Sequence, residues 1–258
     1  MARWHLLLAL ALGSNLAAQT VSFAGKERVT VSDLVRELDA IATDLESSAA
    51  VAADFDRLAV AHGLATDAGQ RKAYARLRLV FECTRDGGLW GVRWTITDRE
   101  PTSAAIWAQW AKWKAPEGDR PDPLAAQPSA DAECDELSAL CAFLADKLSV
   151  GGVGLFWPRS NHTVVVWTAR GKDGKPVRII VPTSQIFLGE DDTLGTGGFD
   201  AASQKTIYTY RHADVDDAFA LPAPLARAFI DRTRKSAGLP AADLQRQRND
   251  RSRTVGGS

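Results

Sequence analysis

Apolar residues recur at three- and four-residue spacing through the first part of the chain, which predicts helices. Over residues 31–60 they fall at Leu34, Leu38, Ile41 and Leu45, after cap-type residues at 30–33. A second helix is predicted from Ala68 to about Cys83. Its apolar face carries Tyr74, Leu77 and Val80, and its opposite face carries Arg71, Arg76 and Arg78.

Further along the chain, apolar and polar residues alternate instead. After a turn signal at 85–88, residues 89–97 alternate as in a strand, with Trp90, Val92, Trp94 and Ile96 on one face. A short helix follows, whose stripe is Ile106, Trp107, Trp110 and Trp113. We expect this stripe to pack on the core.

The second half alternates helix and strand patterns. A helix is predicted over 132–148, followed by strands at 152–157, 162–169 and 176–182, with a turn at 171–174. The last two strands are rich in branched residues, as a buried antiparallel hairpin should be. A strand at 206–210 and a helix at 222–235 complete the predicted fold, and the tail from about Gln245 is predicted to be disordered.

These patterns predict an α+β protein in which a mainly helical half packs on an antiparallel sheet. We divide the chain into a signal peptide (1–20), a mainly helical region (21–115), a linker or long loop (116–131), a second domain (132–240) and a disordered tail (241–258). The linker is assigned from its content of Pro, Ala, Gly and Asp.

The composition limits the classes of function that the chain can have. The chain has 258 residues, is 45% hydrophobic and 24% charged, and has a net charge of −1. This is ordinary for a soluble protein and disfavours nucleic acid or an anionic membrane as the main partner. Arg3, the apolar run Leu6–Leu12 and the small residues Ala17 and Ala18 are typical of a signal peptide. With no later membrane anchor in the sequence, we expect an exported protein, periplasmic or extracellular.

Two residues suggest chemistry at a thiol. Cys134 begins the 132–148 helix, and His162 opens an apolar strand 28 positions later. A helix N-terminus and a nearby imidazolium both stabilise a thiolate, and the imidazole can serve as its base. Cys134 and Cys141 are too far apart on one helix for a disulfide, at about 10.5 Å of rise. A Cys83–Cys141 disulfide would leave Cys134 as a thiol.

A cysteine on a helix, a histidine on a strand and a further strand ending in Pro182-Thr183 resemble the core of transglutaminase-like cysteine enzymes, a branch of the papain-like superfamily. The resemblance covers residues 131–188. It implies a papain-like fold with Cys134 as nucleophile and His162 as base. The family's third residue, an Asp before Pro-Thr, is replaced by Val181.

A histidine base needs a partner for its other nitrogen. Thr183, Ser184, Gln185 and Asn161 are the nearby candidates. We select Gln185, because related papain-like enzymes accept a neutral amide in this role. The resemblance then implies attack of Cys134 on amide bonds of peptides or peptidoglycan-type substrates through a thioester, without a cofactor.

Two alternatives remain open. In one, the same fold is a catalytically inactive binding or structural domain, and Cys134 and His162 are core residues. In the other, an exported sugar-binding module exposes Trp107, Trp110 and Trp113 in a row. No metal is expected, because Cys134, Cys141 and His162 lack paired ligand spacing. The pattern leaves the oligomeric state open.

Overall fold

The structure, a computed structural model of the whole chain, describes residues 23–97, 102–117, 122–159, 162–184, 208–209 and 215–255. The predicted signal peptide lies outside the described residues, as do Asn161 and Gln185. The helices are α1 (Val31–Glu46), α2 (Ala49–His62), α3 (Ala68–Thr84), α4 (Ala104–Ala111), the 3-10 turn η1 (Pro123–Ala125), α5 (Cys134–Lys147), α6 (Ala223–Ser236) and α7 (Ala241–Val255).

The strands form three small sheets. They are β1 (Arg28–Thr30), β2 (Val92–Trp94), β3 (Ala130–Ala132), β4 (Val153–Arg159), β5 (His162–Arg170), β6 (Pro176–Val181), β7 (Tyr208–Thr209) and β8 (Ala220–Pro222). The largest sheet is antiparallel with the order β6-β5-β4-β7. β1 pairs antiparallel with β8, and β2 pairs parallel with β3. The protein therefore has a mixed α+β fold.

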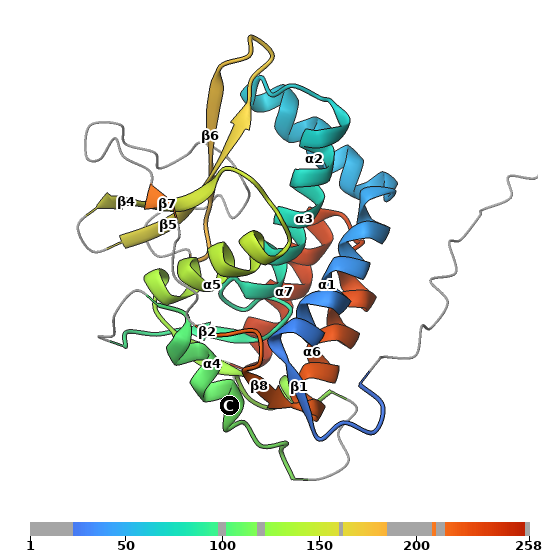
Figure 1. Cartoon of the computed structure of the whole chain (residues 1–258), viewed down its shortest axis with the longest axis vertical. Coiled ribbons are helices and arrows are strands. Elements are labelled where there is room, and N and C mark those ends of the chain that lie inside the picture. Colours follow the sequence, from blue (N-terminus) through green and yellow to red (C-terminus); the bar gives the residue numbers. More distant parts are fainter. Residues whose placement is uncertain are drawn as a thin grey trace, which may run out of the picture.

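Helix α5 joins the main sheet to the helical part of the molecule. It packs on β4 and β5 on one side and on α3 on the other, and α3 packs in turn on α1 and α2 (Figure 1). One cluster of buried apolar side chains contains residues from both predicted halves, from Phe23 to Leu244. The two halves therefore share one core.

The predicted helix over 31–60 is two helices. Thr30 caps α1 in a reciprocal capping box with Asp33, as the cap-type residues suggested. The chain then turns at Ser47, and the Ser48 hydroxyl accepts from the Val51 N–H to begin α2. The break follows from a serine side chain satisfying a backbone donor locally, which the apolar spacing does not reveal.

The predicted helix from Ala68 is confirmed as α3, capped by Asp67. Two arginines of the face opposite the apolar one are buried. The side chains of Arg76 and Arg78 are only 10% and 3% exposed, since α1, α2 and α5 all pack against α3. Arg76 pairs with Asp39 and Glu46, and Arg78 lies 3.3 Å from Asp54, so carboxylates of α1 and α2 compensate the buried charge.

The predicted strand at 89–97 is reduced to β2, which pairs with β3. Trp90 is fully buried, whereas Ile96 is 68% exposed, so the expected common face does not extend beyond the short strand. The 116–131 segment contains η1 and the start of β3, and the Trp110 indole donates to Ser129 at 3.1 Å. Contacts of this kind attach the segment to the core.

The tryptophan stripe of α4 packs on the core, as predicted. The exposed fractions of Trp107, Trp110 and Trp113 are 0%, 0% and 9%. Trp107 and Trp110 meet edge-to-face with ring centroids 5.0 Å apart. Because a sugar platform requires exposed indole faces, these burial values overturn the sugar-binding alternative.

The tail predicted as disordered instead contains α7. Leu244 and Arg248 are 3% and 7% exposed, and the Ala241 N–H donates to Asp54 Oδ2 at 3.0 Å. The low mean hydropathy of this segment led to the prediction of disorder, although one buried leucine and several polar contacts attach α7 to the rest of the protein. Among the described residues no helix is long and apolar enough to cross a bilayer.

Candidate functional site

Cys134 is the first residue of α5, where the sequence placed it. Glu133 is the N-cap, and the Glu136 carboxylate accepts from the Glu133 N–H at 2.9 Å, closing a capping box. Acidic side chains suit this position because they complement the positive end of the helix dipole. The Cys134 thiol is half-buried and not in a disulfide, and it lies near the carboxylates of Glu133 and Asp135.

The surroundings of the sulfur favour the neutral thiol. Burial raises the pKa of the Cys134 thiol above its ordinary value. The backbone N–H of Thr163 counteracts this rise, while the carboxylates of Asp135 and Glu133 add to it. The direction is opposite to that found at reactive cysteines, whose pKa is lowered by cationic neighbours.

Ser138, one turn after Cys134, fixes α5 across the ends of two strands. Its hydroxyl donates to the Thr163 carbonyl at 3.1 Å and lies 2.9 Å from the Thr183 hydroxyl. Ser138, Thr163 and Thr183 are exposed by 2% or less. The first turns of α5 are therefore held against the start of β5 and the end of β6.

His162 is the first residue of β5 and is 1% exposed. Alternate residues of a strand point to opposite faces of the sheet. Val165 and Trp167 belong to the core cluster shared with α5, whereas Val164 and Val166 form a second cluster with Phe156 and Ile180. His162 lies two residues before Val164, so strand alternation places both side chains on the same face, which is the face opposite α5.

The other predicted members of the site can be placed in part. Val181 pairs with Val165 and belongs to the same core cluster, so the position of the family's Asp faces the helix and is apolar. Thr183 is bound to Ser138, and the buried Ser184 Oγ has no hydrogen-bond partner among the described residues. Cys134 thus lies beside the backbone of β5, at the Thr163 N–H, whereas the alternation of β5 assigns the His162 side chain to the other face of the sheet.

The remaining cysteines are not chemically available. Cys83 and Cys141 are fully buried and not bonded to each other, and burial raises the pKa of each to about 12. Cys134 is therefore the one thiol of the chain with solvent access.

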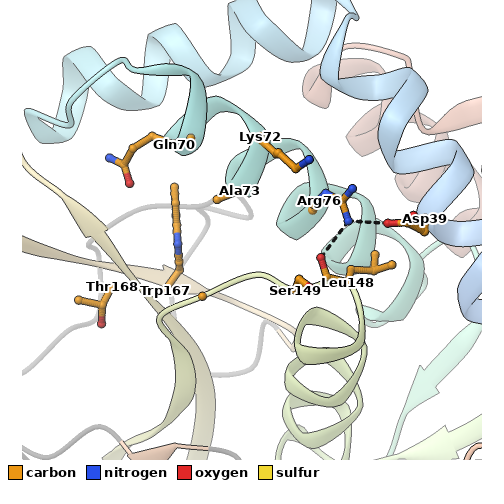
Figure 2. Close-up of a pocket in the computed structure, with 11 residues that line it drawn as sticks. Asp39, Gln70, Lys72, Ala73, Arg76, Leu148, Ser149, Trp167 and Thr168 are labelled. Carbon is orange, nitrogen blue, oxygen red and sulfur yellow. Dashed lines mark hydrogen bonds and ion pairs between the residues drawn. The ribbon is translucent and has the colours of Figure 1, made fainter.

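A pocket lies at the opposite end of α5 (Figure 2). Its volume is about 530 Å³, and it is bordered by α3, by the turn after α5, by β5 and by the edge of α1. None of the residues predicted for catalysis lines it. Sequence reasoning missed this site because its walls come from four elements distant in the chain, and no local motif marks them.

Within the described residues, no group of three or more His, Cys, Asp or Glu side chains is arranged to hold a metal ion. Comparisons of the chain with protein-family models, with curated proteins and with solved structures give no match.

Proposed function

We propose that the protein is a catalytically inactive binding or structural domain in which Cys134 is a structural thiol. The observation that carries this proposal is the position of His162 in the alternation of β5, which assigns its side chain to the face opposite α5. A general base must come within hydrogen-bond reach of the proton it removes. A side chain that points away from α5 is separated from the Cys134 sulfur by the sheet itself.

The charges around the thiol support the same conclusion. Glu133 and Asp135 flank Cys134 in sequence and raise the pKa of its thiol. An ordinary thiol with a pKa of about 8.5 is about 3% ionised at pH 7, and a raised pKa reduces that fraction further. Alkylation of Cys134 should therefore be slow near neutral pH.

The second candidate is the transglutaminase-like thiol enzyme acting on amide bonds of peptides or peptidoglycan-type substrates. The position of Cys134 favours it. The sulfur lies in the first turn of a 14-residue helix, is half-buried, and is next to the Thr163 N–H. Backbone N–H groups at such a site could stabilise an oxyanion.

Alkylation kinetics distinguish the two. Native protein is treated with iodoacetamide between pH 6 and 9, and labelling is followed by intact mass. We expect one slow label whose rate rises about tenfold per pH unit, as the thiolate fraction does. The label should be absent in Cys134→Ser and unchanged in His162→Gln, with circular dichroism confirming that both variants fold.

Rapid labelling of Cys134 at pH 6 that is lost in His162→Gln would favour the enzyme instead. Denatured protein provides the control for labelling, because unfolding exposes Cys83 and Cys141 and three labels should be found.

We also propose export, from the sequence alone. Protein purified from a secreting host should begin near Gln19, after the small residues at 17 and 18.

A further inference from the structure

The pocket at the C-terminal end of α5 is lined by more positive than negative side chains. Lys72 and Arg76 line it from α3, and Asp39 lines it from α1. Arg76 is engaged in the fold: its Nη1 donates to Asp39 at 2.5 Å and to the Leu148 carbonyl at 2.9 Å, and its Nε donates to Glu46 at 2.9 Å. These bonds close the C-terminal end of α5 and neutralise much of the arginine's charge.

Lys72 differs from Arg76. Its side chain is 57% exposed, and the carboxylate of Glu46 lies 3.6 Å from its ammonium group, already beyond hydrogen-bond distance. Glu46 is closer to Arg76 and accepts its hydrogen bond. The ammonium group at the mouth of the pocket is therefore weakly paired, and its charge remains available to a ligand.

The rest of the lining suits a small molecule with an apolar body. Figure 2 shows the Trp167 ring edge-on below α3, with Ala73 to its right and Leu148 and Ser149 at the end of α5. The first turn of α3 contributes Gly69 and Gln70, whose backbone N–H groups donate to the Asp67 carboxylate and are therefore not available to a ligand. One weakly paired cation in a cavity that also has an aromatic wall matches a ligand with a single negative charge and an apolar body.

The walls are held in place by bonds that do not need a ligand. The Gln70 side chain donates to the Arg170 carbonyl at 2.7 Å and accepts from the Arg170 N–H at 3.1 Å, joining α3 to β5. Arg76 joins α3 to the end of α5. The cavity is therefore formed before binding, which lowers the ordering cost of association.

We propose that this pocket binds a small organic monoanion, a carboxylate attached to an aromatic or aliphatic body, with Lys72 as its charge partner and Trp167 and Ala73 as its apolar wall. The inference deepens the binding part of the proposed function and rests on it. A carboxylate is favoured over phosphate because a dianion would require a second weakly paired cation, and Arg76 already pairs with Asp39 and Glu46.

The test is a calorimetric titration of the full chain with phenylacetate, in parallel with phenylacetamide, which has the same shape without the charge, and with inorganic phosphate. At low salt we expect phenylacetate to bind in the millimolar range or tighter, and phenylacetamide and phosphate at least about fivefold more weakly. Added salt should weaken phenylacetate binding by screening the exposed lysine.

Two variants locate the site. Lys72→Met keeps the aliphatic stem and should weaken phenylacetate binding about fivefold, and Ala73→Phe should abolish binding by filling the cavity. Lys175→Met is the matched control, because Lys175 is also an exposed lysine with a single carboxylate nearby, 3.4 Å away on Asp173, and it lies on the hairpin, outside the pocket. It should bind phenylacetate as the unmodified protein does.

The inference is overturned by absence of phenylacetate binding up to about 10 mM. Equal binding of the amide, equal binding of phosphate, or retained binding in Ala73→Phe would overturn it as well. These outcomes are separate from the alkylation result. A reactive Cys134 would refute the inactive domain without affecting the titration, whereas a failed titration would refute the pocket and leave the thiol result standing.

Discussion

The hydroxyl of Ser138 offers a direct test of how α5 is attached to the sheet. Ser138 is fully buried, and its hydroxyl is shared between the Thr163 carbonyl and the Thr183 hydroxyl. Replacing it by alanine removes both contacts and leaves two buried oxygens, on β5 and beyond β6, without this partner. The space left by one hydroxyl group is too small for a water molecule that could replace these contacts.

The expected magnitude follows from these contacts. A buried hydrogen bond contributes about 0.5–1.5 kcal/mol net, and a buried polar group left unsatisfied costs about 1–3 kcal/mol. Alanine recovers about 0.5 kcal/mol through its higher helix propensity. We therefore expect Ser138→Ala to lower the free energy of unfolding by about 1–2.5 kcal/mol, which corresponds to a fall in Tm of roughly 2–10 °C for a chain of this size.

Urea denaturation followed by circular dichroism measures this change. The midpoint should fall while the slope m stays constant, since the area exposed on unfolding is nearly the same. Ser32→Ala is the control, because Ser32 is an exposed serine of α1 and its replacement should change stability by less than about 0.5 kcal/mol. A loss below about 0.5 kcal/mol in Ser138→Ala would show that the hydroxyl does not connect helix and strands.

Three further predictions concern other parts of the fold. Ser149 has a φ of 59°, so Ser149→Gly should raise the free energy of unfolding by about 1 kcal/mol in urea denaturation, and a loss would show that the turn is not strained. Trp110→Phe removes the donor to the buried Ser129 hydroxyl and should cost about 1–3 kcal/mol by the same measurement, whereas an unchanged midpoint would contradict the bond. The hydrogen bond from Lys26 lowers the pKa of Asp33 to about 2, below its unfolded value near 4, so stability present above pH 4 should be lost as the pH falls toward 2. In Asp33→Asn this part of the acid dependence should disappear, and an identical pH profile would refute the assignment.

Much of the fold follows from local pattern. The α3 helix, the α5 helix and the β5–β6 hairpin lie close to their predicted bounds, because each combines strong periodicity with clear caps or turn residues. The failures have local causes as well. The Ser48 cap divides a continuous apolar pattern, and α7 forms despite low hydropathy because Leu244 joins the apolar core and Arg248 is buried. A local side-chain cap decided the first case, and tertiary burial decided the second.

The candidate site shows a different limit. Sequence correctly placed Cys134 at the start of α5, since cap residues define a helix start. It could not determine which face of the sheet His162 would occupy. A shift of one residue along a strand reverses the direction of a side chain. Thr163, not His162, lies an even number of residues from Val165 and so shares its face of the sheet. The spacing of 28 residues fits either face equally well.

The pairing of β1 with β8 has a consequence for how the chain acquires its structure. Val29 and Leu221 are opposite each other and fully buried, although 192 positions separate the paired residues. Helix α1 packs on α6, which directly follows β8. The folding chain therefore carries an incomplete apolar surface on its first helix until β8 and α6 have joined it. Such late closure slows folding and gives chaperones a long interval in which to bind.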